Sequence, residues 1–154
     1  MASKLFASRT NDAIDIDAPA DLVWSVYSDV VGWPAWTESV TSAELSPSGL
    51  LAIGSRAQIK QPRLPRVEWT VTALEAGREW VWENKAPAAT SVAAHSVVAS
   101  GEGRAHVELW IDQRGLVGRT IAVLVRRMTR RYLRMEAEGL KRQCESLARA
   151  RDAG

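Results

Sequence analysis

The sequence has little of several residue types that commonly build functional sites. Of its 154 residues, one is cysteine, two are histidine, two are tyrosine and one is phenylalanine. The single cysteine, Cys144, cannot form an internal disulfide, and neither histidine stands at a metal-ligand spacing. We therefore expect a reducing compartment, no bound metal and no cofactor.

Long apolar runs and common catalytic motifs are also absent. Nothing approaches the roughly 18 continuous apolar residues of a membrane span, and residues 1–12 lack the apolar core of a signal peptide. We expect a cytoplasmic protein with no stable membrane insertion. A glycine-rich phosphate loop and a Gly-x-Ser-x-Gly motif are lacking as well. Nucleotide hydrolysis and Ser-His-Asp hydrolysis therefore have no support.

The net charge is only +2, but the charges are unevenly placed. The segment from Arg114 to Gly154 holds 11 basic and 4 acidic residues, whereas the remainder holds 9 basic and 14 acidic residues. Such asymmetry can mark a membrane or nucleic-acid surface, but more often it marks the solvated face of a helix. We expect no nucleic-acid partner, and the oligomeric state is left open.

Tryptophan is abundant where the other aromatic residues are scarce, with seven in the chain. Trp33 and Trp36 lie in a Trp-Pro-Ala-Trp turn, and Trp69, Trp80 and Trp82 fall on one face of two adjacent strand patterns. Tryptophans gathered on one sheet face form either a bulky core or the wall of an apolar pocket. Both interpretations remain open at this point.

The pattern of the first 35 residues predicts a strand and a helix. Alternation over residues 5–17 predicts a strand, and Ala18-Pro19 opens a helix with proline at its first position. Gly32 is expected to end this helix, and Trp33-Pro34 to turn the chain. Alternating runs separated by turn residues then predict further strands over residues 39–45, 54–61, 67–74, 79–85, 90–100 and 104–113.

From Leu116 to about Arg149 the apolar spacing becomes helical. The predicted buried stripe consists of Val117, Ile121, Leu124, Met128, Tyr132, Met135 and Gly139. A second face carries the arginines Arg126, Arg127, Arg130, Arg131 and Arg134. Short strands joined by hairpin-length links indicate an antiparallel meander. We predict one α+β domain over residues 1–154, with a curved antiparallel sheet of about seven strands wrapped around the long C-terminal helix and two short helices after the first strand.

Several segments resemble one family. These are Ile16–Pro19, Val23–Trp24, Asp29, Trp33–Pro34, Trp36, Trp69–Thr72 and Tyr132–Lys141. Together they are similar to the polyketide cyclase/dehydrase-like branch of the START-related (SRPBCC) superfamily. This resemblance implies the helix-grip fold and a hydrophobic ligand in a cavity beneath the helix. It does not carry over a catalytic residue.

The inward faces of the predicted strands supply most of the candidate cavity wall. Alternation places Val67, Trp69, Val71 and Ala73 inward on one strand. Trp80 and Trp82 share the inward face of the next strand, with Asn84 at its end. Asn84 could orient a ligand carbonyl or hydroxyl, or it could be an ordinary strand-end residue.

His95 is the only candidate catalytic residue. If the Gly-Glu-Gly turn is a three-residue loop with a positive-φ glycine, Ser100 pairs with Arg104, and His95 lies opposite Leu109 on an apolar face. A two-residue loop would place His95 opposite Glu108. We favour the first register. A histidine in an apolar pocket could transfer protons, or it could be a packed side chain with no chemical role.

The helix and the turn complete the candidate site. We expect Met128 and Tyr132 to line the cavity, with Trp33 near one end, although ordinary core packing would give the same pattern. Three functions remain: binding of a small hydrophobic or aromatic ligand, such as a lipid, quinone or polyketide-like metabolite; cyclase, aromatase or dehydratase activity with His95 as acid or base; and peripheral membrane or partner association through the arginine face.

Overall fold

The computed structural model describes residues 5–87, 89–116 and 119–154. Seven strands form one antiparallel sheet in the spatial order β1-β7-β6-β5-β4-β3-β2. The strands are β1 (Leu5–Ile16), β2 (Ser42–Ser46), β3 (Arg56–Lys60), β4 (Val67–Glu75), β5 (Glu79–Ala86), β6 (Ala89–Gly101) and β7 (Arg104–Leu116). The helices are α1 (Ala20–Ser28), the 3-10 helix η1 (Val30–Ala35) and α2 (Arg119–Asp152).

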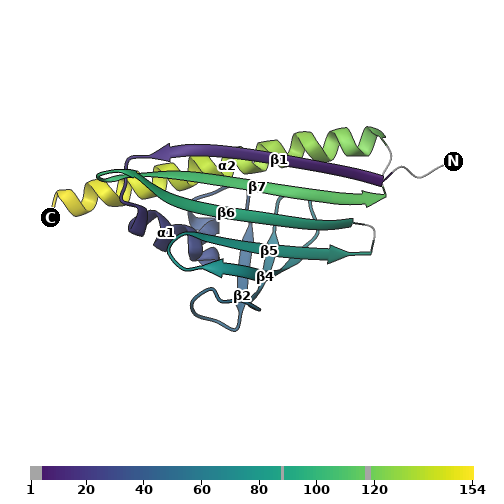
Figure 1. The fold of residues 1–154 in the computed structure, drawn as a ribbon, viewed down its shortest axis with the longest axis horizontal. Helices are drawn as coiled ribbons and strands as arrows, with labels where there is room; N and C mark the ends of the chain where they lie inside the picture. Colours follow the sequence, from purple (N-terminus) through teal and green to yellow (C-terminus); the bar gives the residue numbers. More distant parts are fainter. Residues whose placement is uncertain (1–4, 88, 117–118) are drawn as a thin grey trace.

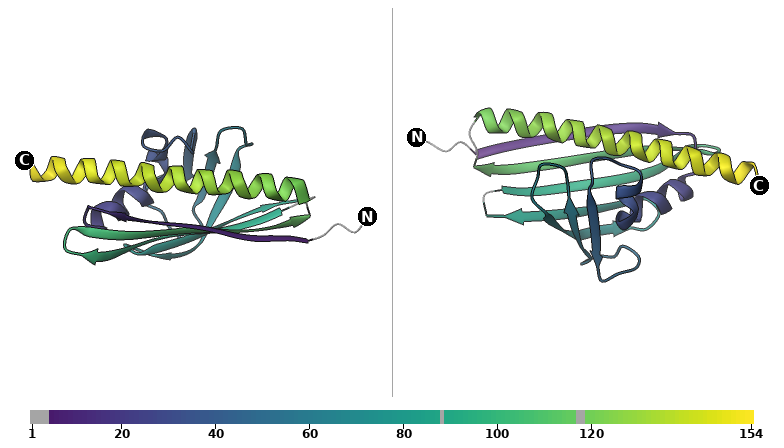
Figure 2. Two further views of the ribbon diagram at one scale, coloured as in Figure 1. Left: turned by 90° about the horizontal axis from the view of Figure 1, so that it is seen from above. Right: turned by 180° about the vertical axis from the view of Figure 1, so that it is seen from behind.

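The sheet wraps around the long helix α2. Figure 1 shows β1, β7, β6, β5 and β4 side by side, with α2 behind them. In Figure 2 the β2–β4 end of the sheet curves toward the side on which α2 lies, and α1 and η1 lie on that same side. α2 packs against β1, β7 and α1. This arrangement confirms the predicted helix-grip fold. No helix in these described ranges is long and apolar enough to cross a bilayer.

Several predicted element boundaries differ from the structure by one to three residues. The strand expected from Ser39 begins only at Ser42, because the Ser39 backbone N–H donates to Thr37 Oγ1 rather than to a neighbouring strand. α2 begins after β7, which continues to Leu116 and pairs there with Leu5. Pro19 is the N-cap of α1 rather than its first residue.

The end of α1 also differs from the expectation. α1 ends at Ser28, four residues before Gly32. Gly32 does not end α1 but lies inside η1, where its backbone N–H donates to the carbonyl of Asp29. The chain therefore turns through a second short helix, which places Trp33 in the protein interior.

A β-bulge corrects the predicted face of Ala73. The pairing of β4 with β5 shifts between Val71 and Ala73, so that Leu74 lies opposite Trp80. Ala73 is consequently exposed, and Leu74 packs against the core in its place. An extra residue in one strand reverses the alternation beyond it, and the sequence carries no turn residue that marks the position.

The predicted buried stripe of α2 is correct in its middle and wrong at Leu124, which is 58% exposed. Successive residues of a helix are about 100° apart, so Leu124 lies about 80° around the axis from Tyr132 whereas Val125 lies only about 20° away. Val125 therefore faces inward in its place. Val117 lies outside the described residues, as does the side chain of Ile121.

Gly139 allows α2 to approach η1 closely. A Cβ atom at this position would collide with the backbone oxygen of Trp36 and would crowd Thr37. The glycine is therefore required by packing rather than by backbone conformation.

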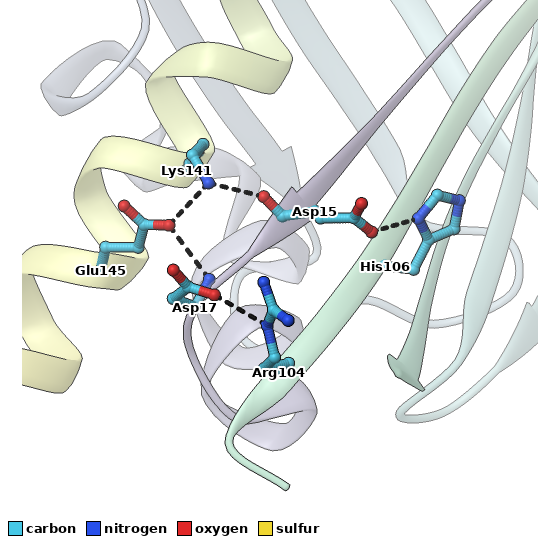
Figure 3. A network of polar contacts seen from close by, with 6 residues as sticks. All are labelled: Asp15, Asp17, Arg104, His106, Lys141 and Glu145. Carbon is cyan, nitrogen blue, oxygen red and sulfur yellow. Dashed lines mark hydrogen bonds and ion pairs between the residues drawn. The ribbon is translucent and has the colours of Figure 1, made fainter. Parts of the chain in front are cut away.

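Polar contacts join the C-terminal half of α2 to the β1–β7 edge (Figure 3). Lys141 Nζ donates to the backbone oxygen of Asp15 at 2.7 Å and pairs with Glu145 at 2.7 Å. Glu145 in turn accepts the backbone N–H of Asp17 at 3.0 Å. Asp15 also pairs with His106, which lies on the outer face of the sheet. This network fixes the helix along the sheet.

Candidate functional site

A cavity of about 230 Å³ lies between the inner face of α2 and the concave side of the sheet. Its wall includes seven of the eight residues that the sequence nominates: Trp33, Trp69, Trp82, Asn84, His95, Met128 and Tyr132. They come from η1, β4, β5, β6 and α2. The curvature of the sheet therefore brings together residues that are up to 99 positions apart in the chain.

Three indole rings form one side of this wall. Trp69 and Trp82 are stacked, with ring centroids 5.6 Å apart and planes inclined by 28°. Trp33 lies 5.7 Å from Trp82 at a tilt of 58°. The Trp33 indole N–H donates to the backbone oxygen of Tyr27 at 2.8 Å, which fixes the ring and satisfies its polar atom. The wall is therefore rigid and apolar.

Trp80 is the nominated residue that does not line the cavity. It is fully buried behind the wall, where its ring stacks on His95 at 4.3 Å and meets Trp24 and Tyr27 edge-on. The strand alternation correctly turns Trp80 inward, but α1 covers it. The question of core or pocket wall is thus answered residue by residue, with Trp80 in the core and its neighbour Trp82 in the wall.

His95 faces the interior in the favoured register. It pairs with Leu109 of β7 as expected. The expected pair of Ser100 with Arg104 is wrong: Gly101 pairs with Arg104, and a register shift between Ala99 and Gly101 reconciles this shorter turn with the His95–Leu109 pairing. The side chain is buried, and burial lowers the pKa of His95 to about 3. Its imidazole is therefore neutral near pH 7. Its Nδ1 atom is buried and has no hydrogen-bond partner among the described residues.

Glu136 is a site residue that the sequence reasoning missed. It is 6% exposed and lines the cavity from α2. Its Oε1 accepts the hydroxyl of Tyr27 at 2.5 Å and lies 3.6 Å from His95 Nε2. Burial raises the pKa of Glu136 to about 7, although the Tyr27 hydrogen bond opposes the rise. Its spacing in the sequence could have revealed it, because Glu136 follows Met128 and Tyr132 at four-residue steps on the inner face of the helix.

Tyr132 and Asn84 make defined contacts at the cavity wall. The Tyr132 hydroxyl donates to the backbone oxygen of Pro62 at 2.5 Å, which joins α2 to the loop between β3 and β4. Asn84 Nδ2 donates to the backbone oxygen of Glu68 at 2.8 Å, so this amide also bridges β5 and β4. Met128 is half-buried, one turn before Tyr132 on the helix.

The arrangement combines an apolar container with one group that exchanges a proton near neutral pH. A carboxyl group with a pKa near 7 can donate or accept a proton with little driving force either way. In the described part of the chain, no cluster of three or more His, Cys, Asp or Glu side chains is arranged to hold a metal ion. Cys144 is buried away from the cavity wall, and burial raises the pKa of its thiol to about 12.

Solved structures of several proteins share this fold. A START superfamily protein from Mycobacterium smegmatis aligns with a TM-score of 0.75 and 13% identity, over 90% of this chain and 98% of the other. The Zhui aromatase/cyclase from Streptomyces sp. R1128 aligns with a TM-score of 0.69 and 18% identity, over 91% of this chain and 94% of the other. Norcoclaurine synthase from Thalictrum flavum aligns with a TM-score of 0.68 and 11% identity, over 90% of this chain and 87% of the other. At these identities the similarity shows the fold.

The sequence itself identifies the family. No curated protein matches it significantly. A family model described as polyketide cyclase / dehydrase and lipid transport matches residues 8–145, which is nearly the whole chain. The chain therefore belongs to the polyketide cyclase/dehydrase and lipid transport family.

Proposed function

We propose that the protein binds a small apolar or aromatic molecule in the cavity beneath α2. The observation that carries this proposal is the wall that Trp33, Trp69 and Trp82 form beside a cavity of about 230 Å³. Cavities for drug-sized ligands measure roughly 300–1,000 Å³. The volume therefore favours a compact ligand, such as a bicyclic quinone or a short aromatic metabolite, over a two-chain lipid.

Binding can be tested with menadione, a bicyclic quinone that quenches indole fluorescence. Saturable quenching is expected, with a single dissociation constant. Trp69→Ala removes part of the wall and should raise that constant about tenfold, which corresponds to about 1.4 kcal/mol. Trp24→Ala is the matched control, because Trp24 is also half-buried but lies outside the wall. Equal effects of the two variants, or no saturation, would indicate a filled core.

The second candidate function is catalysis on such a ligand, and one observation favours it. Glu136 combines a pKa near 7 with a place in the cavity wall. His95, the candidate from sequence, is neutral at this pH and serves better as a hydrogen-bonding partner of Glu136 than as an acid. Cyclases and dehydratases act on carbonyl compounds by removing a proton next to the carbonyl, which is a task for such a carboxylate.

This candidate can be tested without the natural substrate. The protein should accelerate hydrogen–deuterium exchange at the α-carbon of 2-tetralone in D₂O, as followed by proton NMR. Glu136→Gln should lower the rate by roughly 10²–10⁴, the range for a general acid or base. His95→Gln should lower it less. Menadione binding without any acceleration of exchange would favour the carrier function.

Two expectations from the sequence stay predictions. One is the cytoplasmic location. The other is a partner for the arginine face, of which Arg126, Arg127, Arg130 and Arg131 are exposed. Arg134 does not belong to that free face, because its side chain lies 3.3 Å from Asp12 and 3.5 Å from Glu138.

A further inference from the structure

The described residues of the cavity wall include one acidic side chain and no lysine or arginine. Its described polar residues include the amides Gln61, Asn84 and Gln113, and the imidazole of His95. Glu136 is the only carboxylate among these described lining residues, and none of them is lysine or arginine. A ligand that enters the cavity therefore meets at most one formal charge from this set, and that charge is negative.

The acidic group lies at the aromatic part of the wall. His95 is adjacent to Glu136, and its ring lies 5.8 Å from that of Trp33 and 5.1 Å from that of Trp82. Indole faces carry negative electrostatic potential and attract cations within about 6 Å of the ring centre. The carboxylate and the indoles thus favour the same sign of charge at this end of a ligand.

Hydrogen-bonding capacity at this point is also unequal. Tyr27 donates to Oε1 of Glu136, so that oxygen is partly satisfied. When Glu136 is ionised, the imidazole hydrogen belongs on Nε2, which faces the carboxylate. The carboxylate then has accepting capacity left beyond its contacts with Tyr27 and His95. An ammonium group carries three donors and no acceptor, which suits this carboxylate and the aromatic faces better than a hydroxyl with one donor does.

We propose that this cavity selects compact aromatic ligands that carry a protonated amine, with Glu136 as the counter-ion, and that it rejects apolar carboxylates such as fatty acids. The inference rests on the proposed function, because it names the chemical class of the ligand in the same cavity. An anionic ligand would place two negative charges together in a water-poor space, and nothing in the described wall offsets that cost.

Amine binding is coupled to a proton. The titratable groups that face Glu136 are Tyr27 of α1 and His95 of β6, and Asp12 of β1 lies behind Tyr27. Neither Tyr27 nor His95 carries charge near neutral pH, since burial raises the pKa of Tyr27 and lowers that of His95. Because the pKa of Glu136 is about 7, an entering cation ionises the fraction of Glu136 that is protonated, and that proton is released to solvent.

The test compares three ligands of nearly the same shape by isothermal titration calorimetry at pH 7. These are 1-naphthylmethylamine, 1-naphthylmethanol and 1-naphthoic acid. The amine should bind at least tenfold more tightly than the alcohol, and the acid should bind most weakly. Measurements in phosphate and in Tris should differ in apparent enthalpy for the amine in the direction of proton release, because only the amine ionises Glu136. In Glu136→Gln the ratio of amine to alcohol affinity should fall toward one, and the proton release should vanish.

The wild-type protein provides a test that needs no variant. At pH 5 Glu136 is protonated, so the preference for the amine should be lost there and should return by pH 8. If the alcohol binds but the amine shows no preference at any pH, the ligand class is wrong while the proposed function stands. If none of the three compounds and no menadione binds, the proposed function itself fails. Tight binding of the naphthoic acid would also overturn the inference.

Discussion

His95 Nε2 and Glu136 Oε1 lie 3.6 Å apart, in a place where both side chains are more than nine-tenths buried. Burial drives both groups toward their neutral forms, and the two pKa values therefore move in opposite directions. The pair is an uncharged acid beside an uncharged base rather than a salt bridge. The contributions of His95 and Glu136 to stability depend on pH, and mutation of each residue separates one contribution from the other.

The two groups should produce opposing pH slopes of stability. Below pH 6.5 the unfolded state binds a proton at His95 that the folded state refuses down to about pH 3, so stability is lost as pH falls through this window. Between pH 4.5 and about 7 the folded state keeps a proton on Glu136 that the unfolded state loses, so stability is lost as pH rises. Each slope is roughly 1.4 kcal/mol per pH unit, and the two cancel where the windows overlap.

Urea unfolding at several pH values between 4.5 and 6.5 checks this expectation. Relative to the wild type, His95→Gln should lose stability as pH rises, and Glu136→Gln should gain stability as pH rises. The double variant should follow the wild-type profile. Two single variants with parallel profiles would show that at least one of the pKa shifts is misassigned.

Tyr27→Phe should destabilise the protein and raise the pKa of Glu136 further. The Tyr27 hydroxyl is the hydrogen-bond donor to Oε1, and it holds the pKa of this carboxyl down against burial. Leaving a buried acceptor without its donor costs about 1–3 kcal/mol. Carbon-13 NMR titration of the glutamate carboxyls measures the pKa, and phenylalanine keeps the ring that stacks on Trp33. A lower pKa in the variant would contradict the assigned contact.

Tyr132→Phe should speed ligand exchange more than it changes affinity. The hydroxyl joins α2 to Pro62 in the β3–β4 loop, and Gln61 and Leu64 of that loop line the cavity. Loss of this contact frees the loop, so both association and dissociation of menadione should accelerate in stopped-flow quenching experiments. Thr129→Val is the control, because Thr129 bonds the sheet residue Gln113 instead of the loop. Unchanged rates would show that ligands enter elsewhere.

Gly139→Ala should lower stability, although alanine is the better helix former. The gain in helix propensity is about 1 kcal/mol. The added methyl collides with the Trp36 backbone, which cannot rotate away, and overpacking of this kind costs roughly 1–3 kcal/mol. Thermal unfolding should show a lower midpoint. Glu138→Ala at the exposed neighbouring position should stay within about 0.5 kcal/mol of the wild type.

The fold and the inward tryptophans were predictable because they depend on local periodicity. Alternation placed Trp69 and Trp82 correctly. The expected pairing of His95 with Leu109 is also correct, but the three-residue turn behind it is wrong, because Gly101 pairs with Arg104 and a bulge before it keeps the register. The predicted inward position of Ala73 is wrong because a bulge is a feature of strand pairing rather than of one strand. The predicted burial of Leu124 is wrong because the rotation of a helix about its axis depends on how the helix crosses the sheet.

Two features of the site required three-dimensional packing. Trp80 and Trp82 have the same strand parity, and only the position of α1 separates a core residue from a wall residue. Glu136 was overlooked because a glutamate on a helix usually faces water. Its burial depends on Tyr27, which lies 109 residues earlier in the chain and supplies the hydrogen bond. Sequence spacing alone marks the position but not the partner.

The packing of the indoles has an optical consequence. Trp24, Trp80, Trp33, Trp82 and Trp69 form a continuous series in which neighbouring rings are 5.6 to 6.4 Å apart. At such separations excitation energy passes between rings faster than it is emitted. Light absorbed by Trp24, behind the wall, can therefore reach Trp82 at the wall. A quencher bound in the cavity would darken rings that it does not touch, and the loss of fluorescence would be a collective signal rather than the sum of separate tryptophans.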